Sequence, residues 1–201
     1  MNASEFLWTV KTALYRLFRR HVPPFSTIFR AEKRVLQRWL RRAEGSGLWL
    51  DLGCGEGTTF DLAEWKENKV GLDRVKHLLE CGRRQRKAHW VCGTAGALPF
   101  RGERADLVSA VGLVEYVPDR LRFWGELWSV LRPGGVAIVT AARPGLLNAL
   151  RWLLGHRVST AGRAELEREL REAGFVVKET HATLLQWQFF LLKPETERVG
   201  R

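Results

Sequence analysis

The sequence predicts an α/β fold, a doubly wound sheet of seven mostly parallel strands with helices on both faces. Three observations predict it. Strand-like and helix-like segments alternate from residue 48 to residue 141, and a glycine-rich turn follows the first strand. Only a handful of residues separate the last two strands, so these two pair antiparallel as a C-terminal hairpin. A chain of 201 residues is long enough for one such domain with modest additions.

The stretch from Leu48 to Thr58 is the one around which the other elements are organised. Its apolar residues up to Leu52 suit a strand that is buried on both faces of a parallel sheet. Glycines then occupy positions 53, 55 and 57, where they let the chain turn sharply and bring its backbone against a ligand. A helix over 58–65 is predicted to follow, with its free N–H groups pointing at that ligand. Strand, glycine loop and helix together predict a nucleotide-type site.

An acidic residue ends the second predicted strand, which covers residues 69–72. Asp73 lies 22 positions after Asp51. At about that distance an acid accepts hydrogen bonds from both hydroxyls of a bound ribose; the alternative is that Asp73 caps the next helix. The dinucleotide fingerprint G-x-G-x-x-G would need a glycine where the chain has Thr58, which disfavours a nicotinamide oxidoreductase.

The other elements are predicted from apolar periodicity and from turn residues. Helices are expected over 27–43, 75–86, 119–131 and 163–173, and strands over 89–92, 105–110, 135–141, 175–180 and 186–192. The run Pro133-Gly134-Gly135 predicts a tight turn into the fifth strand, and Gly174 ends the last helix. This alternation is Rossmann-like.

Three segments are expected around or within this pattern. Residues 1–46 form an N-terminal helical segment, 47–193 the main domain with a helical insertion at 143–160, and 194–201 a frayed tail. Within the first segment, residues 4–20 form an amphipathic basic helix that packs on the main domain, covers a substrate site as a lid, or lies on a membrane surface. The insertion lies at the carboxyl end of the fifth strand, where it roofs a substrate pocket or packs against the first helix.

Charge and cysteine content bear on partners and compartment. The net charge of +11 favours nucleic acid, phosphorylated substrates or an acidic membrane surface, unless it only reflects an arginine-rich composition. Cys54, Cys81 and Cys92 are odd in number and lack C-x-x-C spacing, so we expect no zinc site, no disulfide framework and a reducing, cytoplasmic location. No transmembrane helix or signal peptide is expected.

Four motifs, in order, resemble those of class I S-adenosylmethionine-dependent methyltransferases. They are motif I with its ribose acid (51–57 and Asp73), the G-D-A-x-x-L-P-F stretch (93–100), the fourth-strand motif (106–119) and the ending R-V-L-R-P-G-G (127–135). The chain is similar to the small-molecule group called methyltransferase type 11, which includes quinone-biosynthesis-like enzymes. The resemblance covers residues 47–142 well and 163–192 loosely.

This resemblance implies a cofactor and the residues that hold it. The cofactor is S-adenosyl-L-methionine, and its product is S-adenosyl-L-homocysteine. Asp51 would hold the methionine ammonium, and Asp73 the ribose hydroxyls. The other implied cofactor-binding residues are Gly53, Cys54, Gly55 and Gly57 in the loop, Arg74, Thr94 and Ala95 at the adenine, and Val111 and Gly112 near the reactive methyl.

The chain departs from the family pattern at two positions. Thr94 stands where the family has an aspartate at the adenine amine, and a hydroxyl accepts a weaker hydrogen bond than a carboxylate. Tyr116 stands where quinone-type relatives have histidine, and a phenol with an ordinary pKa of about 10 is a poor base. The candidate catalytic proton acceptors are Glu115, Tyr116 and Asp119, followed by His156 and His181.

The predicted function is therefore methyl transfer to a small molecule that is lipophilic or anionic. A nucleic-acid methyltransferase is an alternative that fits the charge, but Ala110-Val111-Gly112-Leu113 replaces the N-P-P-[YF] motif that holds a flipped base. A catalytically silent cofactor-binding domain is the other alternative, motivated by Thr94 and Gly112. The expected partners are a small-molecule acceptor and, through the N-terminal basic helix, a membrane surface; nucleic acid is not favoured.

Overall fold

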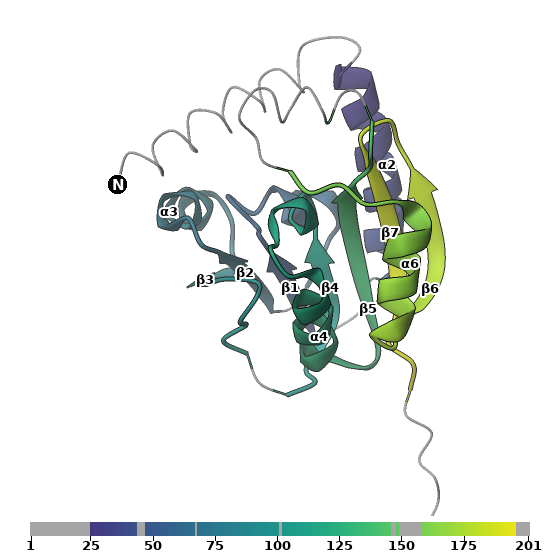
Figure 1. The fold of residues 1–201 in the computed structure, drawn as a ribbon. Helices are drawn as coiled ribbons and strands as arrows, with labels where there is room; N and C mark the ends of the chain where they lie inside the picture. The colour runs from purple at the N-terminus through teal and green to yellow at the C-terminus, as the bar shows by residue number, and fades with distance from the viewer. Residues whose placement is uncertain are drawn as a thin grey trace, which may run out of the picture.

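The computed structural model describes residues 25–43, 47–66, 68–100, 102–145, 148 and 158–195. The strands form one sheet in the order β3-β2-β1-β4-β5-β7-β6, as Figure 1 shows. They are β1 (Leu48–Leu52), β2 (Lys69–Asp73), β3 (His89–Cys92), β4 (Ala105–Ala110), β5 (Leu131–Ala142), β6 (Val176–Ala182) and β7 (Gln186–Leu192). The helices are α2 (Phe25–Arg42), α3 (Lys76–Gln85), α4 (Arg120–Val130) and α6 (Arg163–Glu172), with 3-10 turns η1 (Thr58–Leu62) and η2 (Val114–Tyr116). The predicted fold class is confirmed.

The direction of the strands places the carboxyl ends of β1 to β5 at one edge of the sheet. These five strands are parallel, and β7 runs antiparallel to both β5 and β6. The chain extends the sheet from β1 to β3 in one direction and then resumes with β4 on the other side of β1. The topological switch point therefore lies between the carboxyl ends of β1 and β4, where open α/β sheets bind their ligands.

Helices cover both faces of the sheet, with α4 and α6 in front and α2 behind in Figure 1. The alternation of side chains along β1 supplies both layers. Trp49 packs with Trp39 of α2 and Phe60 of η1, whereas Leu50 faces the layer that contains Phe123 of α4. A run that is apolar at positions 48, 49, 50 and 52 is thus explained by burial on two sides. Among the described helices, none combines the length and the apolar character needed to cross a bilayer.

Two predicted elements differ in detail. The helix expected over 58–65 is the short 3-10 helix η1, which ends at Leu62. The strand expected to begin at 135 begins at Leu131, and its pairing with β4 shifts register between Ala105 and Leu107. The Pro133-Gly134-Gly135 run therefore forms an irregularity within β5 and not a turn before it. Residues 4–20, most of the insertion at 143–160 and the end of the tail lie outside the described residues.

Three glycines make room for the Trp90 indole of β3. A Cβ atom added at Gly57 would lie 2.5 Å from Trp90 Cη2, and one at Gly82 would lie 2.4 Å from the same atom. At Gly71, an added Cβ would lie 3.2 Å from Trp90 Cε3. Gly57 also has a φ of 78°, in the left-handed region that disfavours other residues. Part of the glycine pattern therefore serves packing under the loop and not only access for a ligand.

We expect Gly57→Ala to lower the free energy of unfolding by about 3 kcal/mol, because backbone strain and overpacking against Trp90 both contribute. The measurement is urea unfolding without cofactor. Gly96→Ala is the matched control, because nothing lies within 4 Å of its added Cβ, and a change below about 0.5 kcal/mol is expected there. Equal effects of the two substitutions would contradict this account of the Trp90 slot.

Candidate functional site

The loop from Gly53 to Gly57 turns back over the carboxyl end of β1. Its three glycines have φ angles of 65°, 55° and 78°, so all of them use left-handed backbone. A Cβ added at Gly53 would lie 2.8 Å from Leu113 Cδ1, which shows that the loop packs against the segment following β4. The structure thus brings together two motifs that lie about 60 residues apart in the sequence, at the switch point of the sheet.

Asp51 lies under this loop and is 1% exposed. Its Oδ1 accepts a hydrogen bond of 2.6 Å from Ser109 Oγ, which in turn accepts one of 2.8 Å from Trp49 Nε1. Its Oδ2 is buried and has no hydrogen-bond partner within the described part of the chain. A buried carboxylate oxygen of this kind is costly unless a donor or a cation reaches it.

The environment of Asp51 also changes its proton affinity. Burial raises its pKa from 3.8 to about 7, the Ser109 and Thr59 hydroxyls lower it, and the charge of Asp73 raises it further. Ser109 was not among the predicted site residues. The signal that could have found it is the pairing of two parallel strands, because Asp51 and Ser109 are register partners in β1 and β4.

Asp73 holds the glycine loop through its side chain. Its Oδ2 accepts a hydrogen bond of 2.8 Å from the Gly55 N–H, and its Oδ1 accepts one of 2.9 Å from the Val75 N–H. The second bond closes a turn before α3: the N-cap of this helix is Val75 and no side chain caps it, so Asp73 is not the capping residue of the alternative. Each carboxylate oxygen keeps further acceptor capacity, so the same group can also accept from a ligand.

Of the residues predicted at the adenine, Thr94 and Ala95 follow β3, and Arg74 follows Asp73 at the end of β2. The Gly93 N–H donates to the Asp73 carbonyl oxygen at 3.0 Å and connects the two strand ends. Thr94 and Arg74 are exposed, whereas Ala95 is buried. The Thr94 hydroxyl accepts only a long bond of 3.5 Å from the Gly96 N–H.

The segment after β4 lies open at Gly112. The residue has a φ of 70°, and its N–H donates to Thr140 Oγ1 at 2.8 Å. A Cβ added there would meet nothing within 4 Å. Val111, which precedes it, is half-buried. Among the described residues, none would contact a side chain at Gly112, between the carboxyl ends of β4 and β5.

The candidate proton acceptors occupy different surroundings. Glu115 is 7% exposed and Tyr116 is half-buried, and both belong to η2 beside Gly112. The carbonyl oxygen of Glu115 accepts from the Ser159 N–H at 2.8 Å, so the chain that returns from the insertion packs on η2. Asp119 is instead the N-cap of α4, where it accepts from the Arg122 N–H at 3.0 Å. His181 is exposed on the edge strand β6, and His156 lies outside the described residues.

Cys54 of the loop is buried, and burial raises the pKa of its thiol, which disfavours the thiolate that a nucleophile would need. In the described residues, no group of histidine, cysteine, aspartate and glutamate side chains could hold a metal ion. The chemistry that the site can provide is thus a buried carboxylate for a cation, an acid at the tip of β2 for hydroxyl groups, and an open approach at Gly112.

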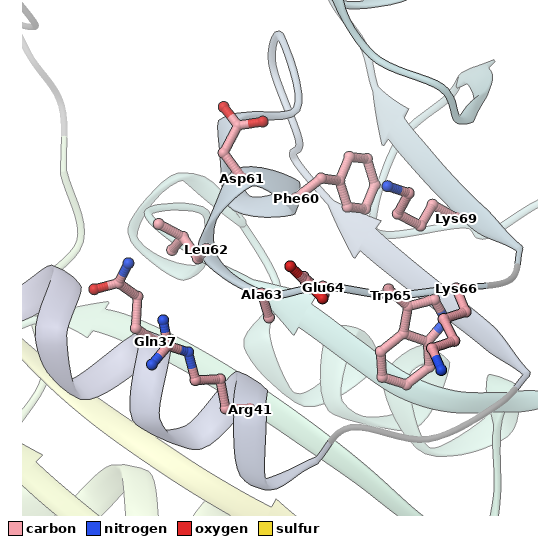
Figure 2. A pocket seen from close by; sticks show the side chains of 10 residues that line it. All are labelled: Gln37, Arg41, Phe60, Asp61, Leu62, Ala63, Glu64, Trp65, Lys66 and Lys69. Atoms are coloured by element: carbon pink, nitrogen blue, oxygen red, sulfur yellow. The ribbon is translucent and has the colours of Figure 1, made fainter.

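A separate cavity of about 760 Å³ lies between α2 and the segment that follows the glycine loop, as Figure 2 shows. Gln37 and Arg41 line one side of it, and Glu64, Lys66 and Lys69 the other. None of the residues predicted to bind the cofactor lines this cavity.

Known proteins are similar to this chain in sequence. A family described as a methyltransferase domain matches residues 50–139. A demethylmenaquinone methyltransferase from a Roseiflexus species is 30% identical over 159 residues, which are 71% of this chain and 67% of that protein. A ubiquinone biosynthesis O-methyltransferase from Azorhizobium caulinodans is 34% identical over 164 residues, with 71% and 63% covered. Across such curated relatives, the chain spans between 27% and 67% of the relative's length.

Solved structures show the same fold. A chain from the complex between the Haloferax volcanii Trm112 methyltransferase activator and a methyltransferase superposes with a TM-score of 0.79. The match covers 97% of this chain and 100% of that one, at 16% sequence identity. At that identity the similarity establishes the arrangement of the elements and nothing finer.

Proposed function

Because the chain belongs to the class I S-adenosylmethionine-dependent methyltransferase family, we propose that it transfers the cofactor's methyl group to a small lipophilic acceptor. The observation that carries the proposal is the buried Asp51 carboxylate, with one oxygen held by Ser109 and the other without a donor in the described residues. Such an oxygen would accept a hydrogen bond from an ammonium group, and the methionine part of the cofactor carries one.

The residues of the site would meet the cofactor in four places. Asp51 Oδ2 would take the ammonium, and Asp73 would take the ribose hydroxyls while it keeps the Gly55 N–H. Arg74, Thr94 and Ala95 would border the adenine. Val111 and Gly112 would lie near the reactive methyl, with the space beside Gly112 left for the acceptor.

The bound cofactor supplies a methyl group that is already activated on a sulfonium. What remains for the protein is to place the acceptor in line with that bond and to exclude water. The Thr140 hydroxyl fixes the Gly112 backbone at this point. Glu115 and Tyr116 are the residues nearest to Gly112 in sequence whose side chains could take a proton from an acceptor hydroxyl. The names of the quinone-pathway relatives support a lipophilic acceptor for this chain.

Two measurements test the proposal in sequence. Calorimetric titration with S-adenosylhomocysteine should show binding at one site. Turnover with S-adenosylmethionine should then appear with a demethylated quinol carrying a short isoprenoid tail, and not with transfer RNA. Binding without turnover on any acceptor would support the silent cofactor-binding alternative, and turnover on RNA alone would support the nucleic-acid alternative.

Tyr116→Phe tests the proton acceptor. If the phenol oxygen takes the acceptor proton, we expect the turnover number to fall by about 100-fold, the usual range for a lost general base, with little change in cofactor affinity. Glu115→Gln is the parallel variant. Whichever of the two substitutions lowers the turnover number at unchanged cofactor affinity identifies the residue that accepts the proton. Activity that persists within about twofold in both variants would show that neither residue moves a proton.

A further inference from the structure

The solvent face of α2 carries a concentration of positive charge. Its basic residues are Arg30, Lys33, Arg34, Arg38, Arg41 and Arg42. The one acidic residue of this helix, Glu32, is 1% exposed and accepts a hydrogen bond of 2.8 Å from the Thr183 hydroxyl. Arg42 pairs with Glu179. Within the described part of the chain, Lys33, Arg34, Arg38 and Arg41 form no ion pair.

Helix α6 does not share this imbalance. In α6, arginines and glutamates alternate and compensate one another: Arg163 pairs with Glu167 at 2.7 Å, and Arg168 with Glu172 at 3.8 Å. The charge of α2 is therefore not a uniform consequence of an arginine-rich composition.

The basic surface continues across the same face of the sheet. Lys66 and Lys69 lie across the cavity of Figure 2 from Arg41. Arg83 and Arg84 of α3 are exposed, and α3 lies on this face because its Gly82 and the η1 residue Phe60 both contact Trp90. Of the acidic residues nearby, Asp61 pairs with Arg86 at 2.6 Å, whereas Glu64 at the cavity and Glu80 of α3 are exposed and outnumbered by the cations. We call the surface formed by α2, α3, Lys66 and Lys69 the basic face.

The basic face lacks exposed apolar side chains. The exposed large hydrophobic residues of the described chain are Leu121, Val176 and Leu184, none of which belongs to α2, η1 or α3. Proteins that bind single-stranded nucleic acid stack bases on exposed aromatic rings. Helices that insert into a bilayer expose an apolar side, whereas Trp39 and Leu40 of α2 are buried on the sheet. Cations spread over α2, α3 and the segment 66–69 of one face match a broad anionic plane contacted by charge alone.

We propose that the basic face docks on an anionic membrane surface through electrostatic attraction. The attraction grows with each cation near the headgroups and decays within a Debye length. This docking does not depend on the identity of the methyl acceptor, so its test uses no cofactor and no turnover.

The test is sedimentation of the 201-residue chain with vesicles of phosphatidylcholine alone, or with about a third of phosphatidylglycerol. We expect binding only to the anionic vesicles, with release at about 0.5 M salt. The double variant Arg34→Gln/Arg38→Gln should lower the partition coefficient by about tenfold or more. The control Arg122→Gln/Arg168→Gln removes the same charge from exposed positions on α4 and α6 and should change it by less than about threefold.

Both variants keep residues 1–24, so binding that depends on that segment alone would leave Arg34→Gln/Arg38→Gln unaffected and would overturn the proposal. Equal losses in the two variants, binding to neutral vesicles, or no sedimentation would overturn it as well. Duplex RNA added at equal phosphate concentration should not displace the protein. Displacement would identify the basic face as a nucleic-acid surface instead. Thermal unfolding of each variant without vesicles checks that both remain folded.

Discussion

Asp51→Asn is expected to weaken the binding of S-adenosylhomocysteine by about 10- to 100-fold, since a hydrogen bond to a charged group contributes about 1.5–3 kcal/mol. The amide keeps the oxygen that accepts from Ser109 but removes the negative charge that would meet the ammonium. Isothermal titration at pH 8 measures the change.

The same substitution should stabilise the protein when no cofactor is bound. Burial raises the pKa of Asp51 to about 7, so the folded state holds its proton more tightly than the unfolded chain does. Stability therefore falls as pH rises from about 4 to about 7, and the loss stays constant above that range. The upper limit of this loss of stability is about 4 kcal/mol. Asn cannot ionise, so the variant should unfold at a higher temperature than the wild type at pH 8.

The pKa of Asp51 also predicts how cofactor affinity depends on pH. Only the ionised carboxylate pairs with an ammonium, so the affinity of the wild type should fall about tenfold per pH unit below about pH 7. In Asp51→Asn this dependence should disappear.

Asp106→Asn provides a matched control for Asp51→Asn. Asp106 lies on β4 at the opposite edge of the sheet, where it accepts from the Leu48 N–H at 2.8 Å and from Arg132 Nε at 2.6 Å. Its substitution should lower stability and leave cofactor affinity unchanged. Unchanged affinity in Asp51→Asn, or equal losses in the two variants, would contradict the proposed ammonium site.

Asp73→Ala is expected to weaken S-adenosylhomocysteine binding by at least about tenfold while the protein remains folded, because charge-assisted hydrogen bonds to the ribose would be lost. The structure adds a second cause, since Ala also releases the Gly55 N–H and thereby loosens the glycine loop. The two causes need separate readouts.

A 2′-deoxyribose analogue of S-adenosylhomocysteine separates them. If Asp73 binds the ribose, the wild type should prefer the natural ribose, and Asp73→Ala should bind both compounds about equally. A variant that binds both more weakly but keeps the preference would show that Asp73 acts only through the loop. Circular dichroism and thermal unfolding check that the variant retains its fold.

Much of the fold was predictable because its signals are local. The apolar run at 48–52 and the glycines at 53, 55 and 57 lie within one short stretch, and β1 and its loop occur where predicted. The helix at 58–65 was predicted too long, since the turn beside the loop closes after Leu62 as a 3-10 helix. The fifth strand was predicted too short, since pairing between Ala105 and Leu131 extends it past the Pro-Gly-Gly run.

The sequence by itself determined the order of the strands along the chain, the glycine loop and the two acids near the ends of β1 and β2, because each of these depends on neighbours within a few residues. Only the tertiary structure decided that Ser109 holds Asp51 and that Trp90 fills the space left by Gly57 and Gly82. It also placed the cations of α2 on the same face as those of α3. These contacts join residues that are distant in sequence, and only the pairing of strands and the packing of helices on the sheet bring them together.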